Sequence, residues 1–350
     1  MSLPEALRVQ AGACGMLGSP FTERLLLILA ERLRPGTPLT DRLFGWPGDI
    51  GPYGASVPLR LAGALHALVL SGTAPALAAC YPPHDVTDET LWTAVEAALK
   101  THAARIDAFL DSAPQTNEVR RSAVLIAIGH WLDARFGLPL ILSELGASAG
   151  LNLNWDRFAL KLPGQTLGPE GAGLVLTPEW RGTAPVPANP QVAERRGVDL
   201  APFDLNRPED ALRLRSYIWA DQADRHALTD AALAEPPAPV DRADAADWIA
   251  ARLEKPRTGH AHLIYNTVAW QYFPDEKQAQ GLAAIEKAGA AATTNAPIAW
   301  FGMETDGNAQ GAALTLRLWP GDLTLEMGRA DFHGRWVDWQ APPPDHGADA

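Results

Sequence analysis

Residues 138–150 read LPLILSELGASAG, a short apolar run that leads directly into a turn of small residues. A run of this length, bounded by glycine, is typical of a parallel strand that is buried on both faces. The segments before it carry apolar residues at helical spacing and no alternating strand pattern. The segments after it alternate between short apolar runs and helical patterns. This arrangement favours a parallel α/β sheet with right-handed crossovers.

The change of pattern at residue 138 predicts two domains. Residues 1–137 are expected to form an all-helical domain, and residues 138–340 a Rossmann-like α/β domain with a β-hairpin insertion at about 156–190. The segment AALTLRLWPGDLTLEM at 312–327 alternates around a Pro-Gly-Asp turn, which predicts a C-terminal antiparallel hairpin. The Pro-rich residues 341–350 are expected to be a disordered tail.

Composition argues against nucleic acid, metal ions and membranes as partners of this chain. The net charge of the 350-residue chain is −12 and no long run of Lys or Arg occurs, so nucleic acid is not expected as a standing partner. Two cysteines, Cys14 and Cys80, are too few for a disulfide framework or a Cys-rich zinc site, and the nine histidines show no metal-ligand spacing. The N-terminus lacks a secretory pattern, and no apolar stretch is long enough to span a bilayer. We therefore expect a cytoplasmic protein with no metal site and no membrane association.

The turn after the apolar run fits a hydrolase motif. Gly146-Ala147-Ser148-Ala149-Gly150 matches G-x-S-x-G, the strand-to-helix elbow that would make Ser148 a nucleophile. The expected context is missing, because the upstream segments are helical and no His-Gly pair precedes Gly146. The histidines available downstream have no distinctive setting; they are His226, His260, His262 and His333. The dinucleotide fingerprint G-x-G-x-x-G also fails, since residues 148 and 151 are Ser and Leu.

The same residues fit a second pattern, E-x-G-x-S-x-G from Glu144 to Gly150, which is typical of a loop that cradles a nucleotide cofactor. Gly146 permits a positive φ and a close approach of backbone to ligand, Ser148 is small, and Gly150 frees the start of a helical turn. Exposed amides at such a turn favour an anionic group. Glu144 would face the crevice where open α/β sheets bind ligands. The alternative is that Glu144 caps local amides and that the glycines only make a turn.

Four segments carry a resemblance to a known family. In order along the chain they are SELGASAGLNLNWDRF, RRGVDLAPFD, LRLRSYIWADQADR and YNTVAWQYFP. With them the sequence resembles the bacterial DUF2332 family over most of this chain. That family is similar to class I S-adenosylmethionine-dependent methyltransferases, mainly in the first loop. The resemblance implies a Rossmann-like methyltransferase sheet, S-adenosylmethionine as cofactor, and Glu144 as the acid that serves the amino group of the cofactor. It supplies no methyl acceptor, for which we expect a small molecule.

The resemblance further implies an acid at the end of the second strand, where it would hydrogen-bond the ribose hydroxyls. Asp199 is the first candidate and Asp204 the second. Their separation from Glu144 exceeds the ~20 residues of a simple βαβ unit, a gap that the insertion at 156–190 explains. Either acid is equally compatible with a solvated turn residue.

IYNTVAWQYFP, residues 264–274, ends a predicted strand where class I methyltransferases keep their reaction loop. Asn266 and Thr267 are the candidate catalytic residues; they would orient the substrate, because methyl transfer needs little beyond alignment of acceptor and sulfonium. Trp270, Tyr272 and Phe273 are candidates for stacking on a ring, with at least two of them expected in the core instead.

Further candidates for substrate contact or for a lid are Tyr53 and Arg60, in and after a Gly/Pro-rich loop, and Asp221 and Arg225, one helical turn apart and expected to pair. The predicted function is S-adenosylmethionine-dependent methyl transfer to an unknown acceptor. The alternatives are a non-catalytic cofactor-binding protein with the same sheet and a serine hydrolase that uses Ser148. The sequence does not define the oligomeric state.

Overall fold

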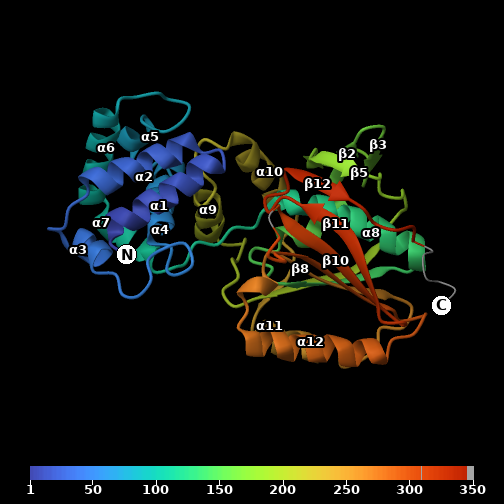
Figure 1. Ribbon diagram of the computed structural model, residues 1–350. Coiled ribbons are helices and arrows are strands. Elements are labelled where there is room, and N and C mark those ends of the chain that lie inside the picture. Colours follow the sequence, from blue (N-terminus) through green and yellow to red (C-terminus); the bar gives the residue numbers. More distant parts are fainter. Residues whose placement is uncertain (309, 345–350) are drawn as a thin grey trace. The chain divides into compact units, whose positions relative to one another are not determined.

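The computed structural model describes residues 1–308 and 310–344 of the chain (Figure 1). The chain divides into two compact units, and both are discontinuous in sequence. Unit 1 comprises Met1–Thr116 and Leu205–Ala227, and unit 2 comprises Asn117–Asp204 and the chain from Leu228 onward. Within the described residues, no helix combines the length and the apolar character needed to cross a membrane.

Unit 1 consists of helices around an apolar core that includes Leu26, Leu61 and Leu65. The start of its second helix shows why these residues form one: Pro20 is the first helical residue, and the Ser19 hydroxyl accepts a hydrogen bond from the Thr22 amide. The helices are α1 (Leu3–Met16), α2 (Pro20–Arg32), α3 (Pro38–Phe44), α4 (Val57–Leu70), α5 (Pro75–Ala78), α6 (Asp88–Thr101), α7 (Ala103–Leu110) and α9 (Pro208–Ser216), and α10 (Ala223–Leu233) crosses the unit boundary.

The division differs from the predicted boundary at residue 137 in two places. Residues 117–137, expected in the helical domain, belong to unit 2, and residues 205–227, expected in the α/β domain, belong to unit 1. There the Tyr217 ring fills the space where Gly63 of α4 lacks a side chain, and His66 Nδ1 lies 3.2 Å from the Ser216 carbonyl oxygen. Between α9 and α10 the chain is not helical, and there Asp221 accepts hydrogen bonds from the Ser19 hydroxyl and the Phe21 amide at the start of α2.

Unit 2 is built on a nine-stranded sheet in the order β5-β12-β11-β10-β9-β8-β1-β6-β7. Strands β7, β6, β1, β8 and β9 run parallel to one another. Strand β10 is antiparallel to β9 and to β11, β12 is antiparallel to β11, and β5 pairs parallel with β12. The strands are β1 (Leu140–Leu145), β5 (Glu179–Gly182), β6 (Val192–Asp199), β7 (Val240–Arg242), β8 (Ala261–Thr267), β9 (Ile298–Glu304), β10 (Ala312–Trp319), β11 (Leu323–Ala330) and β12 (Trp336–Trp339).

The predicted C-terminal hairpin is present as β10 and β11, but it lies inside the sheet because β12 and β5 extend the sheet beyond it.

The insertion at 156–190 differs from the predicted hairpin. A small separate sheet contains β2 (Ala159–Leu162) and β3 (Gln165–Leu167) as an antiparallel pair, with β4 (Val175–Leu176) parallel to β2. The next strand, β5, joins the main sheet rather than closing a hairpin.

Helices cover both faces of the main sheet (Figure 1). On one face, α11 (Ala245–Arg252) and α12 (Asp275–Ala290) enclose a core with Leu145, Ile264 and Trp319. The opposite face carries α8 (Ser122–Phe136), preceded by the 3₁₀ turn η1 (Val119–Arg121) and packed on the 3₁₀ segment η2 (Leu151–Arg157). This helix was expected in the helical domain; it belongs to unit 2 because its Gly129 lies directly against the Trp155 ring.

The C-terminal tail, predicted to be disordered from residue 341, begins as an ordered segment. Trp131 Nε1 of α8 donates a hydrogen bond of 2.8 Å to the Pro342 carbonyl oxygen, and Arg135 donates to the Pro344 carbonyl oxygen. Residues 345–350 lie outside the described residues.

Candidate functional site

The order of the parallel strands places a switch point at β1. From β1 the chain proceeds to β6 and β7 on one side, and to β8 and β9 on the other. Where the strand order reverses in this way, open α/β sheets bind ligands at the carboxyl ends of the strands. The loops that follow β1 and β8 therefore frame the candidate site.

The loop after β1 has an alternating backbone. Gly146, Ser148 and Gly150 hold φ values of +73°, +54° and +72°, whereas the two alanines between them do not have positive φ. The prediction of positive φ at Gly146 is confirmed. The side chain absent from Gly146 would stand 2.5 Å from the Ala269 methyl carbon in the loop after β8. Glycine is therefore required here by the approach of the two loops as well as by the backbone angle.

Protein groups already accept the hydrogen bonds of this loop. The Gly146 and Ala147 amides both lie 3.0 Å from the Val198 carbonyl oxygen of β6. The Ser148 amide donates to Asp199 Oδ2 at 2.9 Å. The Leu151 amide, at the start of η2, donates to the Asn117 side chain. These amides were expected to be available for an anionic ligand, but the fold itself uses them.

Glu144 is the buried acid of the site. Its side chain is 2% exposed, and its Oε2 has no hydrogen-bond partner among the described residues. Burial, reinforced by the nearby Asp199 carboxylate, raises the pKa of Glu144 well above its ordinary value. The charge of Arg121 and a hydrogen bond with Tyr265 act in the opposite direction without cancelling the shift. The surroundings of this carboxyl therefore favour its protonated form.

Ser148 is placed like a spacer rather than like an activated nucleophile. It is 4% exposed, and its Oγ has no hydrogen-bond partner within residues 1–308 and 310–344. A catalytic serine needs a base within hydrogen-bond reach to accept its proton. In the described chain no histidine fulfils that condition, so the geometry does not favour the hydrolase reading.

Asp199 lies at the end of β6, as predicted, and next to the loop after β1. Its two oxygens accept hydrogen bonds from the Ser148 and Ala201 amides, each at 2.9 Å. A carboxylate has about four acceptor positions, so both oxygens retain capacity for a further donor. Asp204, the second candidate, is exposed in the loop that follows.

The loop after β8 is held by Glu304 at the end of β9. Its Oε1 accepts hydrogen bonds from the Ala269 and Trp270 amides and from Asn266 Nδ2, and its Oε2 accepts one from the Gln271 amide. Asn266 Oδ1 in turn accepts a hydrogen bond from Trp300 Nε1 at 2.9 Å. Both ends of the predicted catalytic amide are thus engaged within the protein.

Two further observations concern this loop. The Thr267 side chain is buried, and its carbonyl oxygen accepts a hydrogen bond from Arg121 at 2.8 Å. Val268 has a φ of +55°, which is a true outlier for a β-branched residue. Among the aromatic candidates, Trp270 and Phe273 pack against the core between sheet and helices, as expected for two of the three, and Tyr272 is 71% exposed.

The remaining candidates belong to unit 1. Arg60 is buried and donates to the Ala55 and Leu110 carbonyl oxygens, so it braces the loop before α4. Asp221 accepts hydrogen bonds from the Ser19 hydroxyl and the Phe21 amide, and Arg225 donates to Gln222. Tyr53 is 98% exposed.

The family of the chain follows from a family-model comparison. The model of DUF2332, described as an uncharacterized protein conserved in bacteria, matches residues 4–339. The chain belongs to the DUF2332 family. No curated protein and no solved structure matches it.

Two residues of this DUF2332 chain shape the site and were not among the predicted residues. Arg121 lies beside Glu144 and anchors the β8 end, and Glu304 anchors the loop after β8. Arg121 follows another arginine in a helical segment, where a charge usually indicates a solvated face. For Glu304, its place at the end of a predicted parallel strand was the available signal, since the carboxyl ends of such strands meet at one edge.

Proposed function

We propose that this DUF2332 chain binds S-adenosylmethionine at the carboxyl ends of β1 and β8 and transfers its methyl group to a small-molecule acceptor. The observation that carries the proposal is Glu144, a buried carboxyl with an unpartnered oxygen at the switch point of a parallel sheet. Its position at the end of β1 agrees with the E-x-G-x-S-x-G pattern.

The residues present fit this cofactor in part. A ligand ammonium beside Glu144 would compensate the carboxylate charge that burial and Asp199 disfavour, so binding would favour the ionised form of Glu144. The free acceptor positions of Asp199 suit ribose hydroxyls. The Gly146, Ala147 and Ser148 amides, which already have partners, would not hold the methionine carboxylate. Bound S-adenosylmethionine would supply an activated methyl group.

A second candidate is a cofactor-binding protein without catalysis. It is favoured by the engagement of Asn266 on both sides, by Glu304 and Trp300, because these hydrogen bonds hold the amide in a structural role. The two candidates make the same prediction for cofactor binding and opposite predictions for turnover.

Isothermal titration tests the site, with S-adenosylhomocysteine and 5′-methylthioadenosine as probes. Only the first carries the amino acid portion. We expect Glu144→Gln to weaken S-adenosylhomocysteine at least tenfold, because it removes the charge that pairs with the ammonium, and to leave methylthioadenosine unchanged. The exposed Glu170→Gln is the matched control for loss of one carboxylate.

If neither probe binds the wild type at millimolar concentration, the cofactor assignment is wrong. If Glu144→Gln weakens both probes equally, Glu144 supports the fold of the site rather than the ammonium. Formation of S-adenosylhomocysteine from S-adenosylmethionine in a metabolite extract separates the enzyme from the binding protein.

A further inference from the structure

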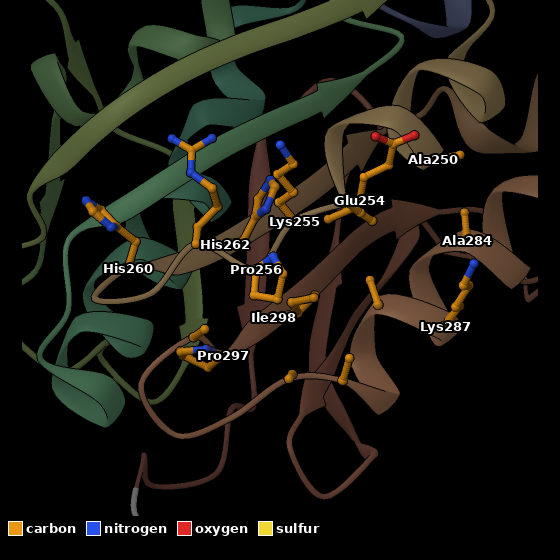
Figure 2. A pocket seen from close by; sticks show the side chains of 16 residues that line it. Ala250, Glu254, Lys255, Pro256, His260, His262, Ala284, Lys287, Pro297 and Ile298 are labelled. Carbon is orange, nitrogen blue, oxygen red and sulfur yellow. The ribbon is translucent and has the colours of Figure 1, made fainter.

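Unit 2 contains a cavity of about 270 Å³ at the amino ends of β8 and β9, the opposite edge of the sheet from the candidate site (Figure 2). Its apolar lining includes Leu253 after α11 and Ile298 at the start of β9. Its charged lining includes Lys255, Arg257 and Lys287. The volume lies near the lower limit of ligand pockets, which run from roughly 300 to 1,000 Å³, so the cavity suits a small molecule.

His262, the second residue of β8, lies among the residues that line this cavity (Figure 2). Its side chain is 4% exposed, and its Nε2 lies 2.8 Å from the Ser143 hydroxyl. Ser143 also accepts a hydrogen bond of 2.6 Å from Arg252 Nε. Because arginine can only donate, the buried hydroxyl satisfies its own hydrogen by donating to His262 Nε2.

This chain of hydrogen bonds fixes the tautomer of His262. Burial, together with the charges of Arg252 and Arg257, lowers the pKa of His262 to about 3, so the ring is neutral at physiological pH. With Nε2 as acceptor, the single ring proton resides on Nδ1. The ring lines the cavity, and the one hydrogen bond of its side chain to a described residue is made by Nε2. Nδ1 of this largely buried side chain is therefore left as a donor for a ligand in the cavity.

The charges around the cavity sum to a positive value. Arg252, Arg257, Lys255 and Lys287 face two acids, Glu254 and Glu194, and Glu194 bridges the two arginines. The C-terminal ends of α11 and α12 also lie here and contribute about half a negative charge each. Four cations against two acids and two helix ends leave a net charge of about +1. Neither Lys255 nor Lys287 has an acidic partner among the described residues, in a protein whose net charge is −12.

We propose that this cavity binds a small organic anion, a carboxylate with an apolar body. The carboxylate accepts a hydrogen bond from His262 Nδ1 and is attracted by Lys255 and Lys287, and the body packs against Leu253 and Ile298. The proposal is independent of cofactor binding at the carboxyl edge, because the two sites share no residue.

The test measures binding to the full chain by isothermal titration. The probes are benzoate, hexanoate, their neutral amides and inorganic phosphate. We expect benzoate or hexanoate to bind and the amides not to bind. Lys255→Glu/Lys287→Glu should weaken the carboxylate at least tenfold, whereas Lys161→Glu, an equally exposed charge reversal on β2, should not. His262→Met should also weaken carboxylate binding about tenfold, because methionine carries no hydrogen-bond donor that could replace Nδ1.

Several results would overturn the proposal. Equal binding of amides and acids would remove the anionic requirement, and binding of phosphate alone would remove the apolar body. Retention of affinity after reversal of both lysines would place the ligand elsewhere, and failure of every probe at 20 mM would leave no site of this class. If His262→Met does not fold, the lysine pair, which is exposed and supports no core packing, decides the question alone.

Discussion

Ser148 and Val268 hold left-handed backbone conformations, with φ of +54° and +55°, just beyond the carboxyl ends of the neighbouring parallel strands β1 and β8. Four non-glycine residues with positive φ occur in the described chain, and two of them flank the switch point. Backbone strain of this kind costs of order 1–3 kcal/mol per residue and gathers at ligand sites, because it persists only where the surrounding structure enforces it.

Replacing Val268 by glycine should relieve this strain. We expect Val268→Gly to raise the free energy of unfolding by about 1 kcal/mol, since glycine adopts positive φ without a steric penalty. Urea unfolding followed by tryptophan fluorescence measures the change. Val268→Ala is the control, because it removes the β-branch and keeps the side-chain carbon. A loss of stability in the glycine variant would show that packing of the half-buried side chain outweighs the strain.

A second prediction concerns the approach of the two loops. Gly146→Ala should destabilise unit 2 by roughly 1–3 kcal/mol, because the new methyl would stand 2.5 Å from the Ala269 methyl and the backbone has φ of +73°. Adding Ala269→Gly to this variant should restore the stability that is lost through the contact between the two methyl groups. The stability that is lost through the positive φ of residue 146 should not return. A double-mutant cycle measures that coupling. Additive effects of the two substitutions would mean that the loops do not meet at these methyl groups.

The raised pKa of Glu144 predicts a pH dependence of stability. The unfolded carboxyl titrates near its ordinary value of 4.5 and the folded one well above it. The unfolded state therefore binds fewer protons between these values, and stability falls as pH rises through that window. Glu144→Gln should remove this fall, so that the stability of the variant relative to the wild type increases as the pH rises above 4.5. Denaturation curves at several pH values test it; parallel pH profiles for both proteins would contradict it.

Ser148→Ala distinguishes a spacer from a nucleophile. A buried hydroxyl without a partner contributes no net stability, so the alanine variant should unfold within about 0.5 kcal/mol of the wild type or be more stable. A fluorophosphonate probe should label neither protein. Labelling of the wild type that disappears in the variant would establish the serine hydrolase instead.

The strands of the parallel sheet were the most predictable part of the fold. The runs around β1, β8 and β9 are apolar and bounded by turn residues, and each became a strand buried in the centre of the sheet. Periodicity also located α8 but not the unit to which it belongs. An apolar helix packs against any apolar face, and the decisive contact, Gly129 on Trp155, joins residues with no shared pattern.

The site was predictable in position and less so in its hydrogen bonds. In the sequence, the small residues of the loop and the acid at the end of β1 predict a ligand-binding loop after that strand. The partners that occupy its amides, Val198, Asp199 and Asn117, come from other elements. The same is true of Asn266, whose two partners are supplied by β9. Side-chain types reveal donors and acceptors but not which of them the fold consumes.

The discontinuity of unit 1 has a consequence for synthesis. Its first 116 residues leave the ribosome without α9, which packs on α4 and returns only at residues 205–227. At about 5–20 residues per second, the intervening stretch delays completion of unit 1 by roughly 5–20 s. During that interval the α4 surface that later meets Tyr217 is uncovered, while β1 and β6 emerge and can pair. The nascent chain thus carries two unfinished cores at once, and its yield should depend on chaperone capacity more than that of a chain whose units follow one another.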